Sequence, residues 1–136
     1  MINSLIPYSG IGDVRFGMTR REIRSLLGPP NRTFRRTPEC TETDYYAARG
    51  FFVEFNTDVC EALEFTGPDN LYWKGVNLFA LPFFEMRDFY DRLSLRLDEE
   101  GTKSVTYHDL GFSLSRSDDN GAVESVLIFS KTYWKG

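Results

Sequence analysis

The chain has 136 residues, of which 41% are hydrophobic and 26% charged, with a net charge of −4. This length and composition predict one domain, 1–136, whose core is large enough to fold without a metal ion or disulfide bonds. No apolar run reaches the roughly 18 residues of a membrane span, and residues 1–7 lack a secretory signal pattern, so we expect a soluble, cytoplasmic protein with no membrane partner. The two cysteines, Cys40 and Cys60, form no C-x-x-C pair, which favours free thiols in a reducing compartment over a disulfide.

The clearest local signal is the stretch 16–30, FGMTRREIRSLLGPP. Thr19 and Glu22 have the spacing of a capping box, in which each side chain satisfies a backbone N–H group at the start of a helix. Gly28 and Pro29 end the pattern, because glycine suits the position after a helix and proline prevents its continuation. The stretch therefore predicts a helix over 19–27. We expect the apolar residues of this helix, Ile23, Leu26 and Leu27, to be buried. Its arginines, Arg20, Arg21 and Arg24, should face elsewhere.

The following segment has the two-residue alternation of β-strands. Residues 31–42 are polar and predict a loop or an irregular edge strand. Turn residues at Gly50 and at 56–58 divide the rest into strands that begin near Thr43, Phe51 and Val59. A turn at 67–70 ends the first half of the chain.

The second half follows the same order. An apolar stripe predicts a helix over about 82–97, followed by strands at 104–107, 111–115 and 122–129, the last two joined by a turn at 118–121. Four identities recur at an offset of 63 residues, namely Gly12/Gly75, Phe16/Phe79, Glu22/Glu85 and Arg24/Arg87.

We interpret this recurrence as two pseudo-repeats, about 10–67 and 73–130, with one unduplicated domain as the alternative. Both interpretations predict an α+β fold. In the first, two similar helix-plus-antiparallel-strand units form one mostly antiparallel sheet with the helices packed on one face.

The pattern F-G-M-T-x-x-E-I-x-x-L-L-G-x-P resembles the small outer-membrane assembly lipoproteins. The two-copy arrangement is similar to the secreted β-lactamase inhibitor protein, a likeness that implies a sheet with an open concave face. In size and acidity the chain also resembles immunity proteins of bacterial toxin systems, including those of contact-dependent growth inhibition. That resemblance implies a protein without catalysis that binds and blocks one toxin domain, often a basic nuclease.

The chain has no residue set typical of catalysis or of cofactor binding. The single histidine, His108, has Asp109 as its neighbour rather than as a facing partner, and the spacing of metal ligands is missing. Glu54, Glu61 and Glu64 lie on adjacent strands, but alternation places Glu61 opposite to Glu64, which favours solvated residues over an acid–base pair. We expect no enzyme activity, no catalytic residue, no metal and no cofactor.

Charge is distributed unevenly. Residues 1–38 carry seven Arg against two acids, whereas 39–136 carry nine Lys and Arg against 18 acids. The Arg cluster at 15–36 has the charge to contact nucleic acid phosphates. Because the rest of the chain is acidic, we expect instead a solvated helix face with internal salt bridges, and we expect no nucleic acid partner.

The acidic part predicts a binding surface. Three acids at 98–100 follow the second expected helix, where the helix dipole disfavours negative charge; a partner or a solvated loop would account for them. If helices cover one face of the sheet, strand residues of the other parity form an open face, on which aromatics anchor a basic partner and acids steer it. A dimer interface or ordinary exposed sheet is the alternative. The predicted partner-binding residues are Tyr46, Phe52, Glu54, Glu64, Asp98, Glu99, Glu100 and Tyr107.

The sequence thus favours an immunity protein that neutralises a cognate toxin domain by occlusion. Two alternatives stay open. One is a structural or interaction module of the envelope-assembly type, and the other is a nucleic-acid-binding protein that uses the 15–36 cluster.

Overall fold

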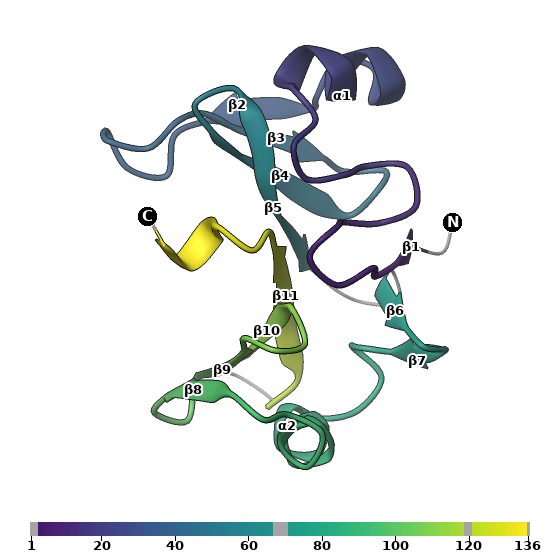
Figure 1. Ribbon diagram of the computed structural model, residues 1–136, viewed down its shortest axis with the longest axis vertical. Helices are drawn as coiled ribbons and strands as arrows, with labels where there is room; N and C mark the ends of the chain where they lie inside the picture. The colour runs from purple at the N-terminus through teal and green to yellow at the C-terminus, as the bar shows by residue number, and fades with distance from the viewer. Residues whose placement is uncertain (1–2, 67–70, 119–120, 136) are drawn as a thin grey trace.

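The computed structural model describes residues 3–66, 71–118 and 121–135 (Figure 1). The turn expected at 67–70 and the centre of the turn expected at 118–121 lie outside these residues. In chain order the elements are β1 (Asn3–Ser4), α1 (Arg20–Leu27), β2 (Arg32–Phe34), β3 (Thr43–Tyr46), β4 (Phe51–Asn56), β5 (Val59–Thr66), β6 (Leu71–Trp73), β7 (Val76–Asn77), α2 (Phe83–Asp91), β8 (Leu97–Glu100), β9 (Ser104–Tyr107), β10 (Phe112–Arg116), β11 (Val123–Phe129) and the 3₁₀ helix η1 (Tyr133–Lys135).

The main sheet has eight strands in the order β2-β3-β4-β5-β11-β10-β9-β8, and every neighbouring pair is antiparallel. The first four strands come from the first half of the chain and the other four from the second, with β5 and β11 adjacent at the centre. A small sheet, β1-β6-β7, contains one parallel pair. The prediction of an α+β fold with a mostly antiparallel sheet is confirmed.

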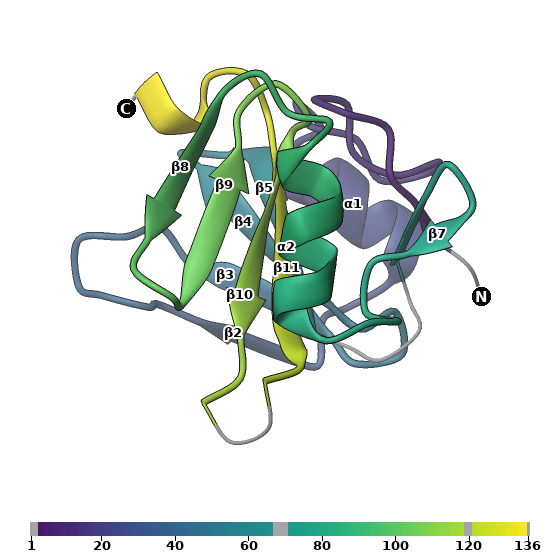
Figure 2. The same cartoon turned by 90° about the horizontal axis from the view of Figure 1, so that it is seen from below.

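Both α-helices pack on the same face of the main sheet. Ile23 of α1 and Tyr90 of α2 are buried in one core with Phe65 and Phe112 of the strands, and the rings of Tyr90 and Phe112 are 5.1 Å apart. Figure 2 shows α2 lying across the β10–β11 region. The short helix η1 lies on the other face, where Tyr133 contacts β4.

The predicted start and end of the first helix are confirmed. Thr19 and Glu22 form both hydrogen bonds of the capping box, and Gly28 follows the helix with φ of 84°, a conformation that favours glycine. The expected burial of Leu26 is wrong, because its side chain is 49% exposed while Ile23 is fully buried. An eight-residue helix turns only a narrow stripe toward the sheet.

The second helix is shorter than predicted and ends at Asp91. The carboxylate of Asp109 accepts hydrogen bonds from the backbone N–H groups of Leu95 at 2.7 Å and Arg96 at 3.2 Å, and from the Ser94 hydroxyl. These bonds hold the chain in the turn that leads into β8. The predicted continuation to 97 is therefore wrong, and the acids at 98–100 belong to a strand rather than to a loop.

Candidate functional site

The face of the main sheet opposite to α1 and α2, called here the open face, is defined by the strand register. Residues that lie side by side on neighbouring strands point to the same side of a sheet. One such row crosses all eight strands in the order Arg32, Tyr45, Phe52, Glu64, Leu127, Ser113, Thr106 and Asp98.

An aromatic–arginine cluster occupies the β2–β5 half of this face. Phe52 stacks on Tyr45 with ring centroids 4.5 Å apart and meets Phe34 edge-on at 5.9 Å. The Arg36 guanidinium lies 5.3 Å from the centre of the Phe52 ring and donates to Glu64 at 2.7 Å. Partly exposed aromatic and arginine side chains are the residue types that anchor protein interfaces.

The two predicted tyrosines are not on the open face. Tyr46 is 5% exposed and Tyr107 is fully buried, because each pairs with a core residue of the next strand, Phe51 and Phe112 respectively. Their hydroxyls donate inward, that of Tyr46 to the Gly28 carbonyl at 3.0 Å. The expected parity was wrong by one residue in β3 and β9, so that Tyr45 and Thr106 occupy the face instead.

The other predicted residues fall into two groups. Phe52, Glu54 and Glu64 lie together on β4 and β5, as expected. Asp98, Glu99 and Glu100 lie on β8, which is the far edge strand of the sheet, and all three are exposed. Asp98 contacts His108 at 2.7 Å. The structure therefore gives two separate acidic groups on the open face, Glu54 and Glu64 near its middle and Asp98 and Glu100 at its edge. Glu99 pairs with the buried Val105, so it points to the helix-covered side of the sheet and not to the open face.

A β-bulge adds Glu61 to the first group. Glu54 pairs with Ala62 whereas Phe55 pairs with Cys60, which leaves Glu61 as an extra residue on β5. A bulge re-aims side chains because it interrupts the two-residue alternation. Glu61 therefore lines the same hollow as Glu54, and the expectation that it stands apart from the other glutamates is wrong.

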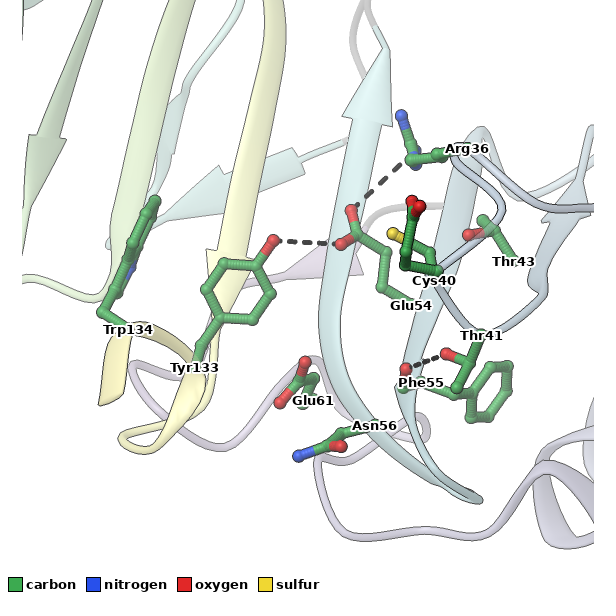
Figure 3. Close-up of a pocket in the computed structure, with 11 residues that line it drawn as sticks. Arg36, Cys40, Thr41, Thr43, Glu54, Phe55, Asn56, Glu61, Tyr133 and Trp134 are labelled. Carbon is green, nitrogen blue, oxygen red and sulfur yellow. Dashed lines mark hydrogen bonds and ion pairs between the residues drawn. The ribbon is translucent and has the colours of Figure 1, made fainter. Parts of the chain in front are cut away.

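The hollow lies between the 36–43 segment, the β4–β5 hairpin and η1, and has a volume of about 460 Å³ (Figure 3). On one side Tyr133 donates its hydroxyl to Glu54 at 3.0 Å. Its lining residues are Arg36, Glu39, Cys40, Thr41, Thr43, Glu54, Phe55, Asn56, Glu61, Tyr133 and Trp134.

Burial shapes the ionisation of the hollow. It raises the pKa of the Glu54 carboxyl, an effect that the positive charge of Arg36 opposes. Burial also raises the pKa of the Glu61 carboxyl, and the negative charge of Glu54 raises it further. Burial likewise raises the pKa of Tyr133, so this hydroxyl is a hydrogen-bond donor at neutral pH. Arg36 forms an ion pair with Glu54 at 3.8 Å, and Glu61 takes part in no ion pair among the described residues, so negative charge in the hollow is incompletely compensated.

No known relative is found. No protein-family model matches the chain, and neither curated proteins nor solved structures give a match. The interpretation of the site rests on its geometry and charge.

Two further findings concern the described residues only. No three His, Cys, Asp or Glu side chains among them come together in a way that would hold a metal ion. Their helices are too short or too polar for a transmembrane segment.

Proposed function

We propose that this chain is an immunity protein that binds a basic toxin domain through the open face and blocks it by occlusion. The observation that carries the proposal is the composition of this face. Partly exposed aromatic rings lie beside Arg36 and the carboxylates of Glu54 and Glu64, on a sheet whose other face is covered by helices.

The two parts of the face have different roles in this proposal. The aromatic–arginine cluster provides buried contact area, because large flat side chains supply most of the energy of an interface. The exposed acids of β8 act at longer range and accelerate association with a basic partner. The net charge of −4 has the sign that such steering requires.

We propose further that the chain consists of two copies of one unit, about 10–67 and 73–130. The order of one helix followed by four strands occurs once in each half, and β5 and β11 lie next to each other at the centre of the sheet. An experimental structure in which rotation about the β5–β11 pair fails to bring α1 onto α2 would contradict duplication.

The decisive experiment is co-expression with the protein encoded immediately upstream. That protein should arrest growth when expressed alone, and growth should recover with this chain. A Phe52→Ala, Glu64→Ala double variant should lose most of the rescue, whereas Glu85→Ala, an exposed residue of α2, should keep it. Absence of toxicity, or of rescue by the unmodified chain, would refute the proposal.

The place of action in this proposal is the cytoplasm. Cys40 and Cys60 are both free thiols, a state that a reducing compartment maintains. Cell fractionation tests this, since recovery in the envelope fraction would support the alternative of an envelope-assembly module. That alternative is favoured by the 16–30 pattern, whose capping box and terminal glycine are both formed.

A further inference from the structure

The hollow beside η1 contains two carboxylates on adjacent strands. Glu54 belongs to the regular part of β4, and the bulge in β5 turns Glu61 toward the same space. Figure 3 shows both side chains near Tyr133, whose hydroxyl donates a hydrogen bond to Glu54.

The positive charge nearest to these carboxylates is committed elsewhere. The Arg36 guanidinium lies 2.7 Å from Glu64 but 3.8 Å from Glu54. Glu61 accepts a hydrogen bond from Asn56 and takes part in none of the ion pairs of the described residues. Glu39 contributes a further carboxylate to the lining. An added cation would therefore gain attraction to several acids and compete with a single arginine.

The remaining walls suit the shape of a long cationic side chain. Tyr133 and Trp134 present aromatic surface, along which a methylene stem packs and against which a cation is attracted. A volume of about 460 Å³ lies in the lower part of the range for small-molecule sites, about 300–1,000 Å³, and accommodates one such side chain.

An organic cation fits the hollow better than a metal ion. Metal sites need several ligands that converge on one point. The described residues provide no such convergence of three His, Cys, Asp or Glu side chains. A guanidinium or ammonium group, in contrast, forms hydrogen bonds to carboxylates that are spread around it.

We propose that this hollow is a receptor for one Arg or Lys side chain presented by a protein partner. The cationic head lies between Glu54 and Glu61, and the stem lies against Tyr133 and Trp134. That the partner is a toxin rests on the proposed function, whereas the pocket and its ligand chemistry do not. The raised pKa values of Glu54 and Glu61 support the proposal, because a bound cation relieves the cost of their burial as anions.

The test uses N-acetyl-arginine-N-methylamide as a probe and backbone amide NMR of the full chain as the readout. We expect saturable binding with a Kd on the order of millimolar, as befits a single side chain. The shifted signals should belong to residues 54–61 and 133–134. The uncharged analogue N-acetyl-citrulline-N-methylamide, which has nearly the same shape, should bind at least about tenfold more weakly, which corresponds to the loss of one charge-assisted contact.

Variants locate the site. Glu61→Gln, in a partly exposed side chain, should weaken probe binding, and Glu54→Gln combined with Glu61→Gln should abolish it. Asp98→Asn with Glu100→Gln removes the same formal charge from β8 and should leave binding unchanged. Unfolding by urea checks that each variant is folded. If the double variant does not fold, the single variant Glu61→Gln still tests the proposal.

Three results would overturn the pocket: no saturable shifts, equal binding of the citrulline analogue, or shifts confined to β8. Growth rescue separates this proposal from the proposed function. Full rescue by the Glu54→Gln, Glu61→Gln variant would refute the pocket as a toxin contact while the immunity function stands. Probe binding without rescue by the unmodified chain would refute the immunity function and leave the pocket.

Discussion

Arg24 binds the buried carboxylate of Asp44 at two points, with Nε donating to Oδ2 at 2.9 Å and Nη2 to Oδ1 at 2.8 Å. Oδ1 of Asp44 also accepts hydrogen bonds from Arg20 at 2.8 Å and from the Thr33 hydroxyl at 2.9 Å. Asp44 is fully buried on β3, so this contact joins α1 to the sheet across the core. The internal salt bridges that the sequence predicted for the 15–36 arginines are thus present at Arg20 and Arg24, where they link the helix to the sheet.

Replacement of Asp44 by Ala should lower the free energy of unfolding by about 3 kcal/mol, because it leaves two guanidinium groups without their buried counter-charge. Unfolding by urea measures this. Arg21→Gln, at the exposed neighbour on α1, is the matched control and should change the free energy by no more than about 0.5 kcal/mol. A loss for Asp44→Ala equal to that of the control would mean that the ion pair contributes no stability.

Tyr107 and Tyr90 form a natural comparison, since both rings are buried and only one hydroxyl is bonded. The Tyr107 hydroxyl donates to Asp91 at 2.8 Å and is 3.1 Å from the Arg87 carbonyl, whereas the Tyr90 hydroxyl has no partner among the described residues. Tyr107→Phe should cost about 1.5 kcal/mol, and Tyr90→Phe should be neutral or slightly stabilising. Thermal and urea unfolding of both variants provide the test. Equal losses would contradict the assignment of these hydrogen bonds.

The two thiols should differ sharply in reactivity. Cys40 is exposed, whereas Cys60 is buried, and burial raises the pKa of the Cys60 thiol to about 12. A disulfide-forming reagent should modify Cys40 quickly at about pH 8 and Cys60 at least roughly 10³-fold more slowly, through unfolding. Cys40→Ser should abolish the fast phase. A fast phase that persists in this variant would show that Cys60 is accessible in the folded protein.

Stability should depend on the ionisation of Glu54. Because burial raises its pKa above the ordinary value of 4.5, the folded protein binds this proton more tightly than the unfolded chain does. Ionised Glu54 therefore costs stability at high pH, and this cost disappears as the pH falls through the raised pKa toward 4.5. The other groups around it are Arg36, Glu61, Glu64 and Tyr133.

The measurement is the unfolding free energy of the unmodified chain minus that of Glu54→Gln, between about pH 7 and pH 5. The difference should move in favour of the unmodified chain as the pH falls. Asp13 does not interfere, because its hydrogen bond from Arg49 lowers its pKa below 3.8 and keeps it ionised throughout this window. A difference that is flat, or that moves the other way, would contradict the raised pKa of Glu54.

Local signals in the sequence were sufficient for the elements that local chemistry controls. The capping box of Thr19 and Glu22 and the glycine at 28 act within a few residues of chain, and the helix they bound is present. The two-residue alternation that begins near Phe51 likewise predicted a strand, present as β4, because this pattern is carried by neighbouring residues alone.

Predictions failed where a distant residue decides the outcome. The apolar stripe predicted a helix to residue 97, but the helix ends at Asp91. Asp109, which follows β9 in the chain, accepts hydrogen bonds from the backbone N–H groups of Leu95 and Arg96 and holds this segment in a turn. The parity of Tyr46 and Tyr107 depends on which neighbours they meet across the sheet. Strand pairing sets these contacts, and residue spacing does not encode them.

The sequence by itself determined the class of fold, the first helix, most of the strands and the acidic character of residues 39–136. Only the tertiary structure decided which charges are free and which are used. It brings Arg20 and Arg24 onto Asp44, joins Arg36 to Glu64, and through one bulge turns Glu61 toward Glu54. The physical reason is that an ion pair or a shared hollow depends on distances of a few ångströms between strands, and those distances are set by sheet register and helix packing.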